Sequence, residues 1–308
     1  MDTYYSNGKL LISGEYLVLD GAVSLALPTK FGQSLQVTQT SNVNISWKSY
    51  NVEKQCWFTA TFDLKKFKIM NCSSVETDAE KVATTLQAIL STAQELNPNF
   101  LQNSKGVAVS TSLTFPNKWG LGTSSTLINS IATWAKVNPF ELLEKSFGGS
   151  GYDIACARYN TPIAYQRNGI DPIITQVDFN PNFKDQLFFV YLNQKQDSKE
   201  GIKMYKSLEV DKSSYIEQLN KLTESLIKAK ELIEFEKIIT KHENVLSQIL
   251  KIKPVKERLF SNYKGAIKSL GAWGGDFVLV TGKEAYVKEY FSHKNYNTII
   301  AYKNMILD

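Results

Sequence analysis

The sequence predicts an α+β protein. Strand-like segments dominate the first part of the chain, a long helical pattern occupies residues 213–250, and the composition is that of an ordinary globular protein. Of the 308 residues, 43% are hydrophobic and 21% are charged, which argues against the disordered, fibrous and membrane classes. This length permits one large domain or two of moderate size. Because the strand-like part ends near residue 182, we expect an N-terminal domain over 1–182 and a C-terminal domain over 183–308.

The N-terminal part is expected to contain mainly strands, with one helix before a glycine-bearing loop. Residues 8–47 and 56–67 have a β-rich composition, and residues 106–115 alternate between apolar and polar side chains as a half-buried strand does. Residues 78–96 instead carry apolar side chains at helical spacing, and Asp78 can cap the N-terminus of that helix.

Helices are expected to dominate the C-terminal part. Residues 213–250 carry two apolar stripes at helical spacing, with a break expected near Glu234. A continuous apolar run at 187–192 predicts a buried strand. A second strand is expected at 277–280, directly after a glycine-rich turn.

The charge pattern disfavours nucleic acid as a partner. The net charge is +5, but nearly all basic residues are lysines, whereas proteins that read base edges rely heavily on arginine. The lysines also alternate with acidic residues instead of forming a basic stripe. We therefore interpret most of them as a solvated surface.

The sequence also shows no targeting or membrane signal. The start of the chain lacks the pattern of a signal peptide, and no apolar run is long enough to cross a membrane. The three cysteines have no C-x-x-C spacing, so neither a disulfide framework nor a zinc site is indicated. We expect a cytoplasmic protein without a membrane partner, as a monomer or a homodimer.

Residues 116–125 form a glycine-bearing loop between an expected strand and an expected helix. Glycines let a backbone approach a ligand closely, and the first turn of a helix offers unpaired N–H groups and a positive dipole end to a phosphate. The hydroxyls of Thr123, Ser124 and Ser125 can bind phosphate oxygens or a magnesium ion. From this segment alone, a plain turn with Ser and Thr as N-caps explains the pattern equally well.

Two further segments carry residues suited to chemistry. Residues 8–21 place Lys9 before a short apolar strand and Glu15 in the turn after it, although an exposed lysine and a turn glutamate would look the same. Residues 148–155 place Asp153 in a glycine-rich turn that opens a helix. That carboxylate is either a general base or an acid favoured by the helix N-terminus.

In this order, these segments resemble the motifs of the GHMP kinase family over essentially the whole chain. The first family motif, G-K-x-x-L-x-G-E-H/Y-x-V, resembles residues 8–18. The phosphate loop, P-x-x-x-G-L-G-S-S-A, resembles residues 116–125, with Thr123 in place of the first serine and Ser125 in place of the alanine. Ordered motifs are far more specific than any single one.

The two remaining family motifs also have counterparts. S-G-x-D resembles residues 150–153, and G-A-G-G-G resembles residues 271–275 except at Trp273. Within the family, Tyr16 and Asp276 resemble the residues found at these positions in the phosphomevalonate kinase branch, with mevalonate kinase the next most similar.

The resemblance implies a two-domain α+β fold, with an ATP-binding N-terminal domain similar to a ribosomal protein and a ferredoxin-like C-terminal domain. It implies ATP and Mg²⁺ as cofactors. The implied reaction is phosphoryl transfer to a hydroxyl or phosphate of a small anionic alcohol, with phosphomevalonate or mevalonate as the first expectation.

The resemblance also assigns roles to residues. Asp153 would take the substrate's hydroxyl proton, and Lys9 would stabilise negative charge beside it. Ser124 would hold magnesium together with Glu144, for which Glu141 and a solvated helix face are alternatives. The residues expected at the ATP phosphates are Gly120, Leu121, Gly122, Thr123, Ser124 and Ser125. The residues expected at the substrate are Glu15, Ser150, Gly151, Gly271, Ala272, Gly274 and Lys195.

Two tryptophans depart from the family pattern. Trp119 and Trp273 stand where the family has small residues, and we expect them to contact one another or the nucleotide. If they block the nucleotide site, the chain would instead be a non-catalytic ligand or nucleotide sensor. His242 falls on an apolar helical stripe and is expected to be structural.

Overall fold

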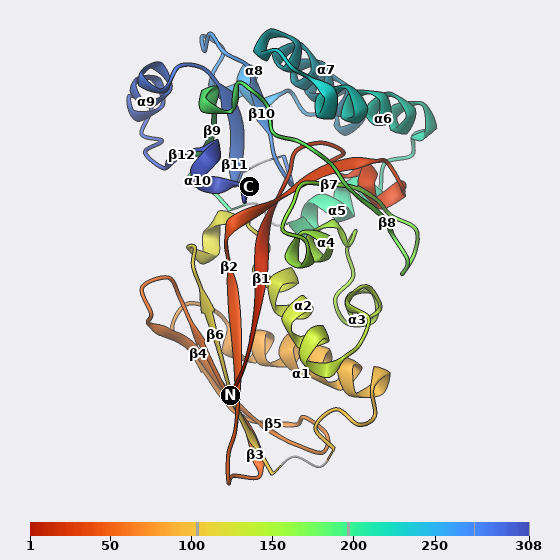
Figure 1. The fold of residues 1–308 in the computed structure, drawn as a ribbon, viewed down its shortest axis with the longest axis vertical. Coiled ribbons are helices and arrows are strands. Elements are labelled where there is room, and N and C mark those ends of the chain that lie inside the picture. Colours follow the sequence, from red (N-terminus) through yellow and green to blue (C-terminus); the bar gives the residue numbers. More distant parts are fainter. Residues whose placement is uncertain (103–104, 196–197, 274, 308) are drawn as a thin grey trace. The chain divides into compact units, whose positions relative to one another are not determined.

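The computed structural model describes residues 1–102, 105–195, 198–273 and 275–307 (Figure 1). The chain divides into two compact units, each of which combines separate stretches of sequence. The first unit comprises Met1–Gly8, Phe31–Asn117 and Leu121–Arg158, and the second comprises Lys9–Lys30, Lys118–Gly120 and Tyr159–Asp308. The two long strands β1 (Asp2–Leu11) and β2 (Ser24–Gln39) contribute residues to both units. The sequence boundary between 182 and 183 stays a prediction.

A mixed sheet forms one layer of the first unit. Its strand order is β5 (Ile69–Ser74), β4 (Cys56–Asp63), β3 (Asn44–Tyr50), β6 (Val107–Leu113) and the second half of β2. β3 runs parallel to β6, and the other neighbours are antiparallel. Along β4 and β6 the side chains alternate between buried and more exposed positions, as in a strand with one face on a core. The strand expected at 106–115 is therefore confirmed.

Helices cover one side of this sheet (Figure 1). Asp78 accepts a hydrogen bond from the Lys81 amide at 3.2 Å, which confirms both the predicted cap and the predicted helix. Apolar side chains of the helices and strands share one core that includes Trp47, Phe62 and Ile131. The helices are α1 (Ala79–Leu96), α2 (Thr123–Ala135), α3 (Pro139–Ser146) and α4 (Tyr152–Arg158).

The second unit contains an antiparallel four-stranded sheet. Its order is β10 (Ile267–Ser269), β11 (Phe277–Thr281), β9 (Leu187–Tyr191) and β12 (Ile299–Ala301). The elements follow one another as β9, helices, β10, β11, α9 and β12, a β-α-β-β-α-β order also found in ferredoxin-like folds. Every residue of β9 and β11 is buried, which agrees with their apolar sequences.

The first half of β2 also belongs to this unit. It pairs with β7 (Ile163–Gln166), and β7 pairs with β8 (Ile173–Gln176). A short 3₁₀ helix, η1 (Leu17–Asp20), lies between β1 and β2, where only strands and turns were expected. The apolar side chains of η1 are buried, and Leu17 and Leu19 pack in one cluster with residues of α6 and α7.

The second unit contains the longest of the described helices, α7 (Leu232–Leu250). The break expected near Glu234 lies earlier, at residues 229–231, because Ala229 and Glu231 both have extended backbones between α6 and α7. No glycine or proline marks this break, so its position could not be read from composition. The other helices are α5 (Ser198–Lys206), α6 (Ser213–Lys228), η3 (Lys184–Gln186), α8 (Val255–Leu259), α9 (Glu284–Ser292) and α10 (Tyr302–Met305).

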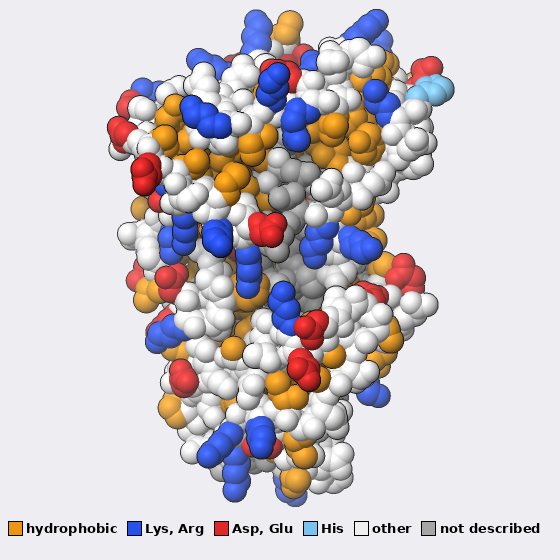
Figure 2. Space-filling view, turned by 180° about the vertical axis from the view of Figure 1, so that it is seen from behind, with side chains coloured by type: hydrophobic (Ala, Val, Ile, Leu, Met, Phe, Trp, Pro, Cys, Tyr) orange, Lys and Arg blue, Asp and Glu red, His pale blue; other side chains and the backbone are white. Residues whose placement is uncertain are grey.

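Within the described residues, no helix combines the length and the apolar character needed to cross a membrane. Basic and acidic side chains occur side by side over the face seen in Figure 2, with hydrophobic side chains between them. The predicted α+β class is confirmed by the helices and the mixed and antiparallel sheets.

Candidate active site

The phosphate-loop segment enters α2 through a 3₁₀ turn, η2 (Asn117–Trp119). Gly122, with φ of 92°, is the N-cap of α2, and the helix begins at Thr123. The Thr123 hydroxyl donates to the Asn117 side-chain oxygen at 3.2 Å, Leu121 is buried, and Ser124 is exposed. The first turn of α2 therefore combines N–H groups that the helix does not pair with an exposed serine, an arrangement suited to an anion.

Asp153 stands in the first turn of α4 and is held from two sides. The Ser125 hydroxyl donates to Asp153 Oδ2 at 2.5 Å, and the Ile154 amide donates to Oδ1 at 3.1 Å. Gly151, with φ of 87°, leads the chain into this helix. Ser125 is buried while Asp153 is half-buried, so the carboxylate is oriented and still reachable. Lone pairs remain on both carboxylate oxygens for accepting a proton.

Lys9 belongs to the second unit together with Gly120. Its half-buried ammonium donates to the Gly120 carbonyl at 2.9 Å. Gly120 has φ of 67°, where any side chain is strained, and a Cβ there would lie 2.5 Å from the carboxyl carbon of Asp276, so the position favours glycine. Gly120, in the phosphate-loop motif, is therefore contacted by Lys9 of the first motif and lies beside Asp276, which follows the last motif.

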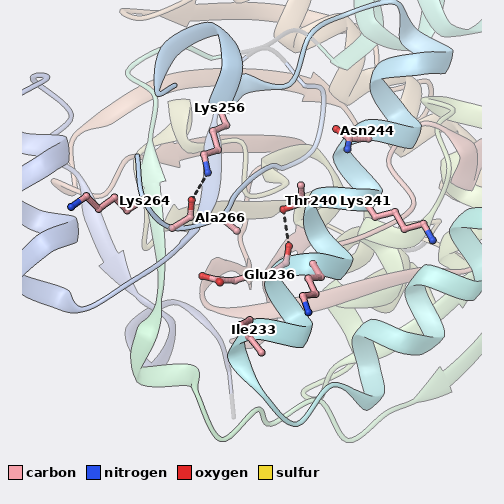
Figure 3. Close-up of a pocket in the computed structure, with 10 residues that line it drawn as sticks. Ile233, Glu236, Thr240, Lys241, Asn244, Lys256, Lys264 and Ala266 are labelled. Atoms are coloured by element: carbon pink, nitrogen blue, oxygen red, sulfur yellow. Dashed lines mark hydrogen bonds between the residues drawn. The ribbon is translucent and has the colours of Figure 1, made fainter. Parts of the chain in front are cut away.

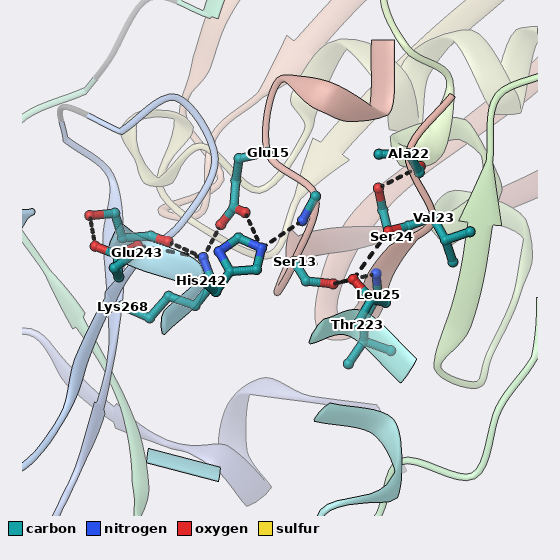
Figure 4. Close-up of polar contacts among 12 residues, drawn as sticks. Ser13, Glu15, Ala22, Val23, Ser24, Leu25, Thr223, His242, Glu243 and Lys268 are labelled. Carbon is teal, nitrogen blue, oxygen red and sulfur yellow. Dashed lines mark hydrogen bonds and ion pairs between the residues drawn. The ribbon is translucent and has the colours of Figure 1, made fainter. Parts of the chain in front are cut away.

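Glu15 does not face solvent but lies in a buried charged cluster, which we define as Glu15, His242, Glu243 and Lys268 (Figure 4). The Lys268 ammonium pairs with Glu15 Oε1 and lies 3.7 Å from Glu243 Oε1. Glu15 Oε2 lies 3.5 Å from His242 Nε2. The Glu243 carboxylate also accepts from the Ser269 hydroxyl at 2.9 Å.

Burial controls the protonation of this cluster. It raises the pKa of Glu15 and raises that of Glu243 to about 7, against the opposing attraction of Lys268. Burial, followed by the Lys268 charge, holds the pKa of His242 well below its ordinary value, so the imidazole is neutral. The structural role expected for His242 agrees with these surroundings.

The last motif lies close to the first one within the second unit. The Tyr16 hydroxyl donates to the Ala272 carbonyl at 2.8 Å. Gly271 and Ala272 are half-buried, and Gly274 lies outside the described residues. Trp273 is buried in an apolar cluster with Tyr16. Trp119 packs edge-on against Phe277, with ring centroids 5.5 Å apart. The expected contact between Trp119 and Trp273 stays a prediction.

The other candidate residues are more dispersed. Glu144 is exposed on α3, and Lys195 is exposed after β9. Ser150 is half-buried directly before Gly151. Among the described residues, no group of three or more His, Cys, Asp or Glu side chains could hold a metal ion. The magnesium roles of Ser124 and Glu144 therefore stay predictions, as do the substrate contacts of Ser150, Gly151 and Lys195.

Sequence reasoning missed Lys268 and Glu243 as partners of Glu15. The one available signal was His242 on an apolar stripe, since Glu243 is its neighbour. Nothing in the sequence marked Lys268 as a partner of Glu15, because it lies in a short strand and belongs to none of the four motifs. No spacing rule links residues 15, 243 and 268.

A shallow hollow of about 430 Å³ lies elsewhere on the second unit, between α7 and the segment before β10 (Figure 3). Lys256 donates to the Gly265 carbonyl at 2.7 Å, and Lys241 and Lys264 extend to opposite sides in this view. None of the predicted site residues lines this hollow. We therefore do not assign the chemistry to it.

Solved structures resemble this chain over nearly its whole length, although no family model and no curated protein sequence matches it. Methanococcus jannaschii mevalonate kinase is 16% identical, with a TM-score of 0.70 over 97% of this chain and 96% of that one. Streptococcus pneumoniae phosphomevalonate kinase, in complex with phosphomevalonate and AMPPNP, is 14% identical, with a TM-score of 0.70 over 98% of both chains.

Lactococcus lactis galactokinase, complexed with galactose, is 13% identical, with a TM-score of 0.67 over 94% of this chain and 87% of that one. Mevalonate, phosphomevalonate and galactose kinases share one fold, so the likeness supports a fold and does not select a substrate. The fold implied by the four motifs is confirmed at this level: the chain shares the fold of these mevalonate, phosphomevalonate and galactose kinases.

Proposed function

We propose that this protein is an ATP-dependent kinase that phosphorylates a small anionic alcohol. The observation that carries the proposal is the hydrogen bond between Ser125 and Asp153. It joins a carboxylate to the first turn of the helix that follows the phosphate loop. A base beside a phosphate-binding helix start is the arrangement that phosphoryl transfer to a hydroxyl requires.

The first turn of α2 fits the phosphates of ATP. Its amides are not used within the helix, and the Ser124 hydroxyl is exposed among them. Magnesium bound with nucleotides uses one or two protein oxygen ligands, phosphate oxygens and water. Ser124 and Glu144 would hold that ion, which neutralises phosphate charge when bound.

The proposed reaction needs two protein groups beyond the phosphate loop. For a hydroxyl acceptor, Asp153 accepts the proton of the alcohol, whose oxygen forms a bond to the γ-phosphorus of ATP while the bond from that phosphorus to the departing ADP oxygen breaks. A phosphate acceptor would attack through an oxygen that is already ionised, and the same bond to ADP would break. Lys9 stabilises the negative charge of the attacking oxygen and of the transferred group. Its bond to the Gly120 carbonyl supports this role, because that carbonyl belongs to the phosphate loop.

For the substrate, we propose phosphomevalonate or mevalonate. The motif details at Tyr16 and Asp276 support this branch, and mevalonate and phosphomevalonate kinases are among the structures this chain resembles. Galactokinase is also among them, so a sugar hydroxyl is the competing acceptor.

The test is ADP release from ATP and magnesium with mevalonate, phosphomevalonate and galactose supplied separately. Each alcohol is compared with a reaction that lacks an acceptor. We expect turnover of one of the two mevalonate compounds to exceed that of galactose by at least a hundredfold in kcat/KM. A preference for galactose would contradict the substrate assignment. Nucleotide binding without turnover of any acceptor would contradict kinase activity and favour the sensor function.

A further inference from the structure

The turn at residues 14–16, which follows the strand carrying Lys9, has a backbone that needs support. Gly14 and Tyr16 have φ of 87° and 62°, both in the left-handed region, which is uncommon for a tyrosine. A Cβ at residue 14 would lie 2.2 Å from the Ser24 hydroxyl oxygen. A bulky residue keeps such a conformation only where its surroundings hold it.

Buried groups from α7 and β10 hold the first two residues of the turn. The Gly14 amide donates to His242 Nε2 at 3.0 Å. The Glu15 carboxylate pairs with the Lys268 ammonium, and both side chains are 0% exposed. Figure 4 shows Glu15 pointing toward His242 and Lys268. A buried pair of this kind is screened little by water, so its attraction is strong, and the hydrogen bond from the Lys268 ammonium to Glu15 Oε1 gives it a direction.

His242 can accept this hydrogen bond only as a neutral imidazole. With Nε2 as the acceptor, the proton of the ring is on Nδ1. The burial of the ring and the nearby Lys268 charge both favour the neutral form. Lys268 therefore acts on the turn twice, by pairing with Glu15 and by keeping His242 able to accept from Gly14.

The third residue of the turn reaches the last motif. Burial and the nearby Glu15 charge raise the pKa of Tyr16 to about 12, so its hydroxyl keeps the proton that it donates to Ala272. The Tyr16 ring stacks on Tyr205, with centroids 5.5 Å apart. Lys268 and Ala272 belong to the same short segment, so two contacts tie this segment to the turn.

We propose that His242 and Lys268 are positioning residues that hold the 14–16 turn, and with it the end of β1 that carries Lys9, against the segment 268–273. This inference rests on the proposed function for the role of Lys9. The inference also replaces the substrate contact expected for Glu15 with a structural role, because its buried carboxylate is paired with Lys268.

Amide hydrogen exchange, followed peptide by peptide by mass spectrometry, tests this without using activity. In His242→Leu the Gly14 amide loses its acceptor, so we expect exchange in peptides covering 12–18 to become at least tenfold faster. His242→Gln offers a side-chain oxygen at a similar position and is expected to restore most of the protection. Peptides covering 44–63, in the sheet of the first unit, should not change.

A test of Lys268 should not leave the Glu15 carboxylate buried without its cation. The double variant Glu15→Gln/Lys268→Met removes both charges of the pair together, and faster exchange is expected at 12–18 and at 268–273. Lys221→Met is the matched control, because Lys221 is an exposed lysine paired with Glu217 on α6. Exchange as slow as in the wild-type protein at 12–18, in His242→Leu and in the double variant, would overturn the proposal.

Kinetic measurements then distinguish a role in positioning Lys9 from a role in folding alone. With the alcohol that the wild-type protein phosphorylates, His242→Leu is expected to lower kcat at least tenfold, with KM for ATP changed less than threefold and kcat recovered in His242→Gln. An unchanged kcat would overturn the link to Lys9. If the wild-type protein phosphorylates no alcohol, the proposed function fails, while the exchange data still decide whether His242 and Lys268 hold the turn.

Discussion

The carboxylate of Asp153 and those of Glu15 and Glu243 lie in opposite surroundings. Asp153 is half-buried and accepts from one hydroxyl and one amide, both of them neutral donors. Glu15 and Glu243 are buried beside the Lys268 ammonium. The first arrangement belongs to the first unit and the second belongs to the second unit.

We propose that this difference separates an acid that takes part in the reaction from acids that stabilise the structure. A half-buried carboxylate whose described donors are a hydroxyl and an amide has lone pairs with which it can take a proton from a ligand. A buried carboxylate paired with a lysine cannot contact a ligand. Loss of its partner instead changes the free energy of unfolding and the backbone geometry around it. Asp153 and Glu15 both lie in glycine-bearing motifs, and we propose that their carboxylates serve two different purposes. Four predictions test this contrast.

The largest expected effect is on catalysis. Asp153→Asn should lower kcat by about two to four orders of magnitude, because an amide cannot accept the hydroxyl proton. ATP binding, measured by calorimetry, should stay within a few-fold of the wild-type value. Asp171→Asn, at an exposed aspartate, is the matched control and should retain full activity. Wild-type turnover in Asp153→Asn would remove Asp153 from the mechanism.

The buried cluster should respond in stability. Lys268→Met leaves Glu15 and Glu243 without their cation, and breaking a buried pair in this way costs about 3–5 kcal/mol. Urea unfolding at pH 7 measures the loss. Glu15→Gln/Lys268→Met should recover part of it, because fewer charges then remain buried. A single variant as stable as the wild-type protein would show that Lys268 does not balance the cluster.

The protonation of Glu243 should make stability depend on pH. Its pKa is raised to about 7 in the folded protein, so the folded state binds more protons than the unfolded state between the unfolded pKa and about 7. Stability from this group is therefore present at low pH and is lost as pH rises through that window. Glu243→Gln should gain about 2 kcal/mol relative to the wild-type protein between pH 5 and pH 8.

Urea unfolding of both proteins at pH 5, 6.5 and 8 gives this difference directly. The contributions of Glu15 and His242 are present in both proteins and largely cancel in the comparison. A difference between the two proteins that is constant across these pH values would mean that Glu243 titrates as an ordinary glutamate.

The sequence predicted elements and motifs better than the contacts between them. Helical spacing and a cap located the helix that begins after Asp78, and the continuous apolar run at 187–192 located the buried strand β9, because local sequence determines these elements. The break between α6 and α7 was placed too late, since nothing local marks it. The 3₁₀ helix η1 was also missed, because its apolar residues Leu17 and Leu19 are buried by contacts with helices that are distant in the sequence.

The candidate site shows the same limit. Ser125 and Asp153 were each identified from their own motif, but their hydrogen bond depends on how α2 packs against α4. The partners of Glu15 depend on tertiary structure entirely, because His242, Glu243 and Lys268 lie more than two hundred residues further along the chain. A motif therefore predicted where Glu15 stands and could not predict that a lysine would neutralise it.

The smallest expected effect concerns the Ser125 hydroxyl, which donates to the proposed base. Ser125 stands where the family pattern has alanine, and in this protein its hydroxyl donates to Asp153. A hydrogen bond to a charged group contributes roughly 1.5–3 kcal/mol, but only the part that orients the carboxylate in the transition state affects turnover. We therefore expect Ser125→Ala to lower kcat about three- to tenfold, with KM for ATP unchanged, and Ser125→Thr to recover most of the loss because it keeps the hydroxyl. In Asp153→Asn the further change Ser125→Ala should have little effect, since the two residues act through one contact. Additive losses in the double variant would show that Ser125 acts on the phosphates and not on the base.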